Sequence, residues 1–201
     1  MQAEEAAQLA RPASAAARDW RPVAILLGTS ALILGATQAP YVNWQPVAAP
    51  LDVKPLVIRK DAKGDGRFQS PRSGNRRHRG IDLSAPLQSP VRAIRSGRVV
   101  TVGMHHGLGT FIEVDHGRSL HSLYAHLQAA TVQPGQRVRQ GEQIGAVGKT
   151  GNARHRWISP HLHLEVLDHG TPINPQTLGL QIAESPAPDM TLEGADADGG
   201  E

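Results

Sequence analysis

Two histidines in the segment PHLHLEV, residues 160–166, have the types and spacing that most clearly suggest chemistry. The alternation of polar and apolar residues predicts a strand with His161, His163 and Glu165 on one face. Cα atoms two residues apart on a strand are roughly 6.5–7 Å apart, so both imidazoles can reach one cleft. One ring could bind a metal ion while the other acts on what the metal binds. The pattern also fits the solvent-facing side of a half-buried strand, so it indicates a site only if the chain supplies further ligands.

His78 and Asp82, in the segment RHRGID, are the candidates for those ligands. Residues at i and i+4 can share a face in a strand or a helical turn, and Gly80 between them allows a close approach to an ion. With one histidine of the later pair they give two imidazoles and one carboxylate. Three such ligands with an open fourth position are what a catalytic zinc ion requires. The chain has no cysteine, which excludes a thiolate zinc site, a cysteine nucleophile, a lipoprotein anchor and any disulfide.

His126, in the segment LYAHL at the end of a predicted strand, is a further candidate. Near a metal ion it could donate a hydrogen bond to developing negative charge, although alone it is better explained as a histidine in solvent. Glu165 either orients a ligand ring as a hydrogen-bond acceptor or faces water. All ten histidines lie within residues 78–169. Three of them fall in or beside predicted turns and are expected to lie in solvent: His105, His106 and His116.

Short strands separated by glycine turns are expected to position these side chains. Aromatic residues make up only 3% of the chain, against 21 glycines and 15 prolines, which favours a turn-rich β architecture. No βαβ alternation and no long amphipathic helix is evident, so the predicted fold is mainly β, an antiparallel sheet whose long loops form a cleft. The expected strands are Val91–Val102, Thr110–Asp115, Ser119–Tyr124, Gln143–Val147 and His161–Leu167.

Composition divides the chain into five parts. They are an Ala-rich polar segment (1–21), an uncharged apolar stretch (22–39), a Pro-rich tether (40–60), the main domain (61–180) and an acidic tail expected to be disordered (181–201).

The apolar stretch 22–39, with Arg18 and Arg21 just before it, is expected to take the domain out of the cytoplasm. As a helix it spans about 27 Å, just enough to cross a bilayer core. Its densest part, Val23–Ala36, also fits a signal peptide cleaved after Ala39. A proline directly after that position disfavours cleavage, so we favour a membrane-spanning helix with a cytoplasmic N-terminus. The expected location is the cell envelope or periplasm, with the protein anchored in the inner membrane.

The net charge of +3 conceals a basic folded region. Six acids lie after Gln181, so residues 1–181 hold 12 of the 18 acids and all 21 lysines and arginines. This balance suggests an anionic partner, such as a membrane surface or an acidic polymer. No basic stripe interleaved with aromatic residues is present, so nucleic acid is not an expected partner.

The chain resembles the lysostaphin/LytM-type zinc metallopeptidases, also called β-lytic metallopeptidases, which cleave peptide cross-bridges of bacterial peptidoglycan. The resemblance covers about residues 61–180. It rests on ordered motifs, among them RHRGIDLSAP (77–86), HGLGTFIEVDHG (106–117), LYAHL (123–127) and PHLHLEV (160–166). It implies a LytM-like fold, of the duplicated barrel-sandwich type. It also implies one zinc ion bound by His78, Asp82 and His163, with His126 and His161 as the catalytic histidines.

The function implied by this resemblance is zinc-dependent hydrolysis of peptidoglycan cross-bridges, with His161 as the general base. The alternative is a non-catalytic LytM-like domain that activates a cell-wall amidase, because some relatives have lost their ligands. All five site positions keep the residue type of the family, which argues against that alternative.

Residues 152–159 depart from the family pattern, because many relatives have a shorter Gly/Ser-rich link there. The segment contains Arg154, His155, Arg156 and Trp157. Either Trp157 and the two arginines contact glycan or stem-peptide carboxylates, or Trp157 packs under its own loop.

Overall fold

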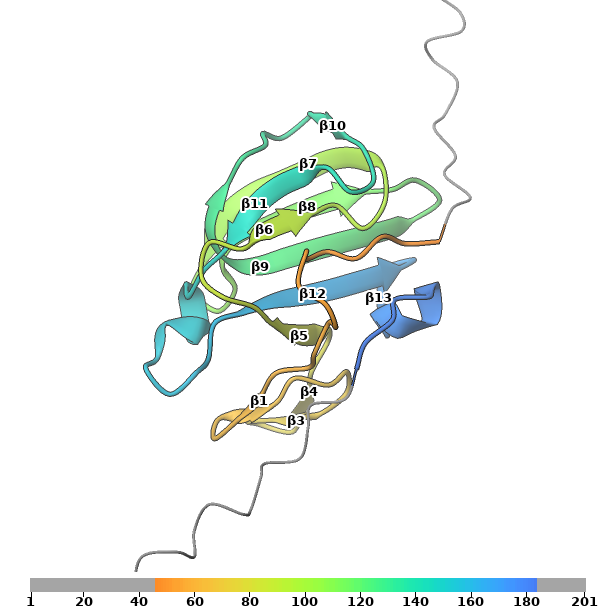
Figure 1. The fold of residues 1–201 in the computed structure, drawn as a ribbon. Coiled ribbons are helices and arrows are strands. Elements are labelled where there is room, and N and C mark those ends of the chain that lie inside the picture. The colour runs from red at the N-terminus through yellow and green to blue at the C-terminus, as the bar shows by residue number, and fades with distance from the viewer. Residues whose placement is uncertain (1–45, 184–201) are drawn as a thin grey trace, which may run out of the picture. The chain divides into compact units, whose positions relative to one another are not determined.

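The structure is a computed structural model in which residues 46–183 are described (Figure 1). The expected membrane helix over 22–39, the segment 1–21 and the acidic tail beyond residue 183 lie outside the described residues, so these predictions are not tested. No helix within residues 46–183 is long and apolar enough to cross a membrane.

Strands are the main regular structure of the described chain, with two brief 3-10 helices and no α-helix within residues 46–183. In chain order the elements are β1 (Lys60–Asp61), β2 (Gly64–Asp65), β3 (Pro71–Arg72), β4 (Arg76–Arg77), β5 (Ile81–Ser84), β6 (Pro90–Arg92), β7 (Gly97–His105), β8 (Gly109–Asp115), β9 (Leu120–Ala130), β10 (Arg137–Val138), β11 (Gln143–Val147), η1 (Gly151–Arg154), β12 (His161–Asp168), β13 (Thr171–Ile173) and η2 (Pro175–Leu178).

The main sheet is organised around its longest strand, β9. One edge of β9 pairs with β8. The other edge pairs with β12 over Leu120–Ala125 and with β11 over Leu127–Ala130. The sheet therefore forks at His126, with β11 and β6 on one branch and β12, β5 and β13 on the other (Figure 1). The hairpins β1–β2 and β3–β4 form two small separate sheets.

The core explains why β12 is almost entirely buried. Leu162, Leu164 and Val166 on one face of β12 are 0% exposed and belong to the hydrophobic cluster. Burying each such side chain contributes roughly 1.5–3 kcal/mol. Because side chains alternate along a strand, this burial forces His161 and His163 onto the opposite face, as predicted.

The prediction of a mainly β, antiparallel fold is confirmed, because every pairing between named strands of the described region is antiparallel. The expected strand Gln143–Val147 coincides with β11. The predicted strand Ser119–Tyr124 is too short, since β9 runs on to Ala130. The single strand expected over Val91–Val102 is wrong, since the chain leaves the ladder between β6 and β7.

The chain leaves the ladder between β6 and β7 because its backbone amides donate hydrogen bonds to groups outside the ladder. The N–H of Ala93 donates to the carbonyl of Glu142 at 2.9 Å. The N–H of Ile94 donates to the phenol oxygen of Tyr124, a fully buried side chain, at 2.8 Å. A buried amide needs a partner, and these contacts supply one outside a strand ladder.

The extended tether expected over residues 40–60 is wrong for its described part. Leu51, Leu56 and Ile58 are at most 7% exposed and pack in the core. Prolines exclude a regular central strand but do not prevent apolar side chains between them from packing on a sheet. At the other end Ala183 still pairs with Val57, so the folded region extends beyond both limits of the predicted domain 61–180.

His116 also differs from its prediction, because it is half-buried rather than in solvent. One ring nitrogen lies 3.0 Å from the carbonyl oxygen of Ser96 and the other 2.7 Å from the hydroxyl of Ser122. Burial lowers the pKa of His116 to about 4, only partly opposed by the hydrogen bond to Ser96. His105 and His106 are exposed, as predicted.

We expect His116 to make the fold acid-sensitive. Its pKa is lower in the folded than in the unfolded chain, so its contribution is present above pH 6.5 and is lost as the pH falls towards 4. The variant His116→Gln should reduce the loss of unfolding free energy between pH 7 and pH 4.5 by on the order of 2 kcal/mol. Urea unfolding with a chelator present measures this, and equal losses in both proteins would contradict it.

Candidate metal centre

A β-bulge in β9 presents His126 at the fork of the sheet. Tyr124 and Leu127 face Ile112 and Thr110 of β8, so two residues of β9 lie opposite one residue of β8. His126 has a φ of 61°, in the left-handed region that non-glycine residues rarely adopt. Such a backbone costs roughly 1–3 kcal/mol and is common at functional sites.

The pairing of β12 with β5 brings together the expected metal ligands. His163 lies directly opposite Asp82, and the Nδ1 atom of His163 is 2.8 Å from Oδ1 of Asp82. His78, just before β5, places Nε2 at 3.2 Å from the same Oδ1 and at 3.1 Å from Nδ1 of His163. One ligand atom from each residue thus falls in a single cluster whose atoms all lie within 4.8 Å of one another.

This donor set fits a zinc ion. Zn–N and Zn–O bonds of roughly 2.0–2.1 Å in a tetrahedron separate neighbouring ligand atoms by about 3.3 Å. The three separations found here, 2.8, 3.1 and 3.2 Å, approach that edge length. All three side chains are buried, at 3–6% exposure, and no fourth His, Cys, Asp or Glu of the described residues joins the group. A catalytic site with one open position has this composition.

The outer nitrogens of the two ligand imidazoles are held by acceptors. Nδ1 of His78 lies 2.9 Å from the carbonyl oxygen of Arg67. Nε2 of His163 lies 3.1 Å from Oε1 of Glu165. A carbonyl or a carboxylate can only accept, so these outer nitrogens carry protons. The inner nitrogens offer lone pairs to a metal once His163, whose pKa is raised to about 9, gives up its inner proton. Glu165 is 8% exposed, so of its two expected roles the structure favours that of an acceptor for a ligand ring.

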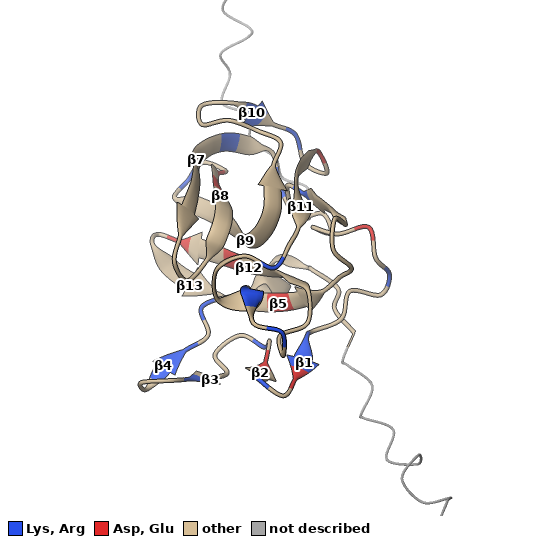
Figure 2. Ribbon diagram, turned by 90° about the vertical axis from the view of Figure 1, so that its left-hand side faces the viewer, with Lys and Arg blue, Asp and Glu red and all other residues tan. Residues whose placement is uncertain are grey.

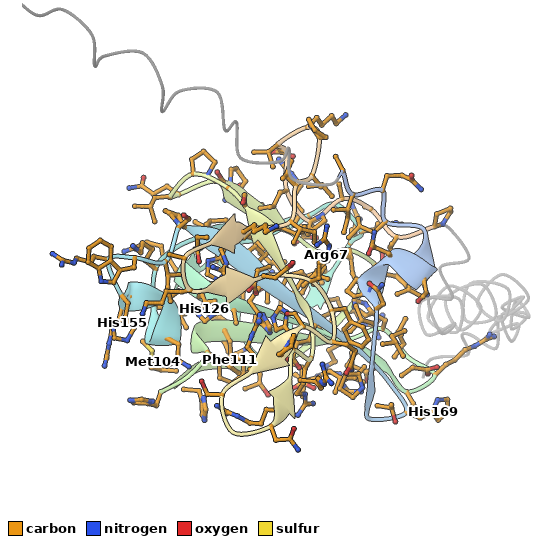
Figure 3. The ribbon with its side chains drawn as sticks, turned by 90° about the horizontal axis from the view of Figure 1, so that it is seen from below. Arg67, Met104, Phe111, His126, His155 and His169 are labelled. Carbon is orange, nitrogen blue, oxygen red and sulfur yellow. The ribbon has the colours of Figure 1, made fainter. Side chains whose placement is uncertain are left out.

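His126 and His161 follow the same rule. Their Nδ1 atoms lie 3.0 Å from the carbonyl oxygen of Thr150 and 2.7 Å from that of Ser159. The Nε2 atom of each ring is therefore unprotonated when the ring is neutral. The ring centroids are 5.0 Å apart, and that of His126 lies 5.7 Å from that of His163. Figure 3 places His126 on the side of the domain that carries Met104 and His155, away from His169.

The buried ionisable side chains of the site are of two kinds, charged and neutral. Burial opposes the charge of Asp82, but hydrogen bonds with His163 and His78 hold its pKa well below the usual range. Burial also opposes a charged His163, but hydrogen bonds with Asp82 and Glu165 raise its pKa to about 9. Burial lowers the pKa of His126 to about 3 and that of His161 below its usual value. His126 and His161 are thus neutral rings available to accept protons.

Gly80 serves a different purpose from the one expected. A Cβ atom there would lie 2.3 Å from the carbonyl oxygen of Leu164. The close approach that Gly80 allows is therefore to the backbone of β12, where it lets the segment before β5 reach the ligand strand.

Arg59 is the site residue that the sequence analysis missed. Its Nη2 donates to Oδ2 of Asp82 at 2.9 Å, and the side chain is buried. It lies in the stretch interpreted as a tether, and the signal in the sequence is its position at the end of the apolar run LVIR.

The segment 152–159 begins with η1 and ends beside His161. Ala153 is its buried residue, whereas Trp157 is 58% exposed and has the guanidinium carbon of Arg156 3.9 Å from its ring centroid. The expectation that Trp157 packs under its loop is therefore wrong. A contact between Trp157 and a ligand stays a prediction.

Comparison with known proteins places this site in a family. Residues 76–175 match the profile of peptidase family M23. The DD-carboxypeptidase/endopeptidase Mpg of Neisseria meningitidis serogroup B is 37% identical over 141 residues, 70% of this chain and 30% of that protein. The peptidoglycan DD-endopeptidase ShyB of Vibrio cholerae is 34% identical over 108 residues, 54% of this chain and 24% of that protein. This chain thus spans about a quarter to a third of their length. A solved zinc containing peptidase from Vibrio cholerae matches with a TM-score of 0.54 at 28% identity, over 65% of this chain and 39% of that one.

We expect zinc to displace a proton from the site. Without a metal, His163 is protonated below its pKa of about 9, and a ligand nitrogen must be deprotonated. The affinity for zinc should therefore rise about tenfold from pH 7 to pH 8. Competition titration against a chelator of known affinity at each pH measures it. His105→Ala, which removes an exposed histidine, should leave the slope unchanged, and an affinity independent of pH would contradict the prediction.

Proposed function

This chain belongs to peptidase family M23, and on that premise we propose that it is a zinc-dependent endopeptidase that hydrolyses peptide cross-bridges of bacterial peptidoglycan. The observation that carries the proposal is the cluster of His78, Asp82 and His163 with two further imidazoles at its edge. Two longer relatives, of which this chain matches a part, are named DD-carboxypeptidase/endopeptidase and peptidoglycan DD-endopeptidase. These names support peptidoglycan as the substrate class.

Zinc held by the three ligands would supply a Lewis acid for the scissile carbonyl and lower the pKa of a nucleophilic water to about 7. His161 takes the proton of that water through Nε2. Its Nδ1–H donates to the carbonyl of Ser159, so Nε2 is the basic nitrogen. Since burial lowers the pKa of His161, the ring is neutral and able to accept at neutral pH.

His126 is suited to orienting the water. Its Nδ1–H donates to the carbonyl of Thr150, so its Nε2 is also an acceptor. A neutral ring in this tautomer accepts a hydrogen bond from water and does not donate one to an oxyanion. Of the two roles that a second histidine could take here, the geometry favours this one.

Variants of the two histidines on β12 should separate chemistry from metal binding. His161→Ala should keep its zinc and lower turnover by about 10²–10⁴-fold, because it removes only the base. His163→Ala should lose both zinc and turnover, because it removes a ligand. The assay is digestion of purified peptidoglycan by the full chain, with mass spectrometry of the fragments and metal analysis of each protein. His105→Ala serves as the control.

Full activity after chelation would reject the zinc mechanism. Zinc-loaded protein that releases no fragments but stimulates a cell-wall amidase would instead favour the non-catalytic alternative.

The exposed Trp157 and its arginines are proposed to contact the substrate. The adjoining region is basic, since residues 59–80 contain eight lysines and arginines but two acids, and residues 149–160 contain three and no acid. Figure 2 shows such residues on β1 and β4, at the end of the domain next to β5. An aromatic ring beside guanidinium groups suits sugar faces and carboxylates.

Trp157→Ala should weaken binding to isolated cell walls several-fold and slow their digestion, while the fold and the zinc content stay unchanged. Sedimentation of the protein with cell walls measures binding. Val100→Ala, another exposed apolar residue, is the control. Binding and digestion equal to those of the unmodified protein would reject the contact.

We also propose that the domain works in the cell envelope or periplasm, anchored in the inner membrane by residues 22–39. The uncharged stretch flanked by arginines supports this location.

A further inference from the structure

We propose that Arg59 and Asp61 form a positioning relay that links the metal ligand Asp82 to the proposed base His161. Neither residue of the relay touches the reacting atoms. Only its effect on turnover rests on the proposed function, since the contacts themselves concern side chains of this chain alone.

The first link fixes the carboxylate of Asp82. His163 and His78 contact its Oδ1, whereas Nη2 of Arg59 donates to the other oxygen, Oδ2, at 2.9 Å. Arg72 adds a longer contact to Oδ2 at 3.4 Å. The main chain of Arg59 is held as well, because its N–H donates to the carbonyl of Asp82 at 2.8 Å. With Oδ2 held, rotation of the carboxylate away from the two imidazoles is opposed.

The second link joins the same guanidinium to the segment 152–159. Nη1 of Arg59 forms an ion pair with Oδ2 of Asp61, a residue of β1. That oxygen also accepts a hydrogen bond from the N–H of Ser159 at 3.0 Å. Asp61 and Ser159 are 98 residues apart in the sequence, so Asp61 is where the N-terminal hairpin and the loop before β12 meet.

The third link reaches His161. The carbonyl of Ser159 accepts from Nδ1 of His161 at 2.7 Å. A single residue thus has its N–H held by Asp61 while its carbonyl holds the imidazole. Pro160, which follows, has no N–H and a restricted φ, and this limits the ways in which Ser159 can turn.

The relay adds something that the strand ladder does not provide. Pairing of β12 with β5 places His161 opposite Ser84 and His163 opposite Asp82 at the backbone. The relay acts on the side chains, since it fixes the carboxylate plane of Asp82 and the tautomer of His161. Partners of this kind typically change metal affinity or activity by about 10–100-fold.

Asp61 is the better residue to change first. Arg59 is buried between two carboxylates, and truncating it would leave both without their shared cation. Asp61→Ala leaves Arg59 paired with Asp82 and removes the ion pair between Asp61 and Arg59, the link to Ser159 and the hydrogen bond from the N–H of Lys63. Asp65→Ala is the matched control, because Asp65 lies on the same hairpin, pairs with Arg67 and accepts its backbone N–H.

The test uses the zinc-loaded full chain and long-range ¹H–¹⁵N spectra of the histidine rings. In the unmodified protein and in Asp65→Ala, His161 should show one tautomer, with the proton on Nδ1. In Asp61→Ala its nitrogen signals should shift towards a mixture of tautomers, and turnover should fall about tenfold. Signals and turnover in Asp61→Ala that equal those in Asp65→Ala would overturn the relay.

Arg59→Lys tests the other end, since lysine keeps the charge but cannot contact both carboxylates with separate nitrogens. It should weaken zinc binding about 10–100-fold in chelator competition. The double variant with Asp61→Ala should match Asp61→Ala alone in the His161 signals, because Arg59 acts on Ser159 only through Asp61, whereas independent, additive changes would overturn the proposal.

These readouts remain informative if the proposed function fails. An unmodified protein that releases no fragments from peptidoglycan would reject the endopeptidase. The ring signals and zinc affinities of the variants would still decide whether the relay exists.

Discussion

The burial of one carboxylate, that of Asp82, governs the rest of the site. A charge removed from water must be compensated by nearby charges and hydrogen bonds. Oδ1 of Asp82 faces the imidazoles of His78 and His163, and Oδ2 faces Arg59 with a longer contact to Arg72. These contacts keep the carboxylate ionised, which is the state in which it can bind a metal. Arg59 reaches Asp82 from the stretch of chain before β1, whose Leu56 and Ile58 pack in the core.

The fork of the sheet supplies the second half of the site. β9 changes partner at His126, from β12 to β11, and the bulge there turns the imidazole towards the ligands. The chain between those two partners, residues 148–160, provides the carbonyls of Thr150 and Ser159 that hold His126 and His161. One topological feature therefore gives both neutral imidazoles their position and their tautomer. The left-handed backbone conformation of His126 costs conformational free energy, and the surrounding contacts hold the residue in it.

Sequence reasoning succeeded where a local pattern has one physical solution. The alternation along 161–166 can bury its leucines only by placing the histidines together, and the structure has that arrangement. It failed where distant segments compete for the same groups. The strand expected over Val91–Val102 breaks because a tyrosine hydroxyl and a carbonyl from elsewhere in the chain take its amides. The sequence predicts that His116 lies in solvent, because no local pattern indicates its hydrogen-bond partners Ser96 and Ser122.

By itself the sequence determined the composition of the site, its five histidine and aspartate residues, and the antiparallel β fold that carries them. The structure brings those five side chains together, while their catalytic roles stay predictions. Only the tertiary structure decided which nitrogen of each imidazole faces inward, that Glu165 contacts a ligand ring, and that Arg59 belongs to the site at all. The reason is physical. Residue type and alternation are local properties, whereas the protonation and orientation of a buried side chain depend on partners that lie up to 85 residues away in the chain.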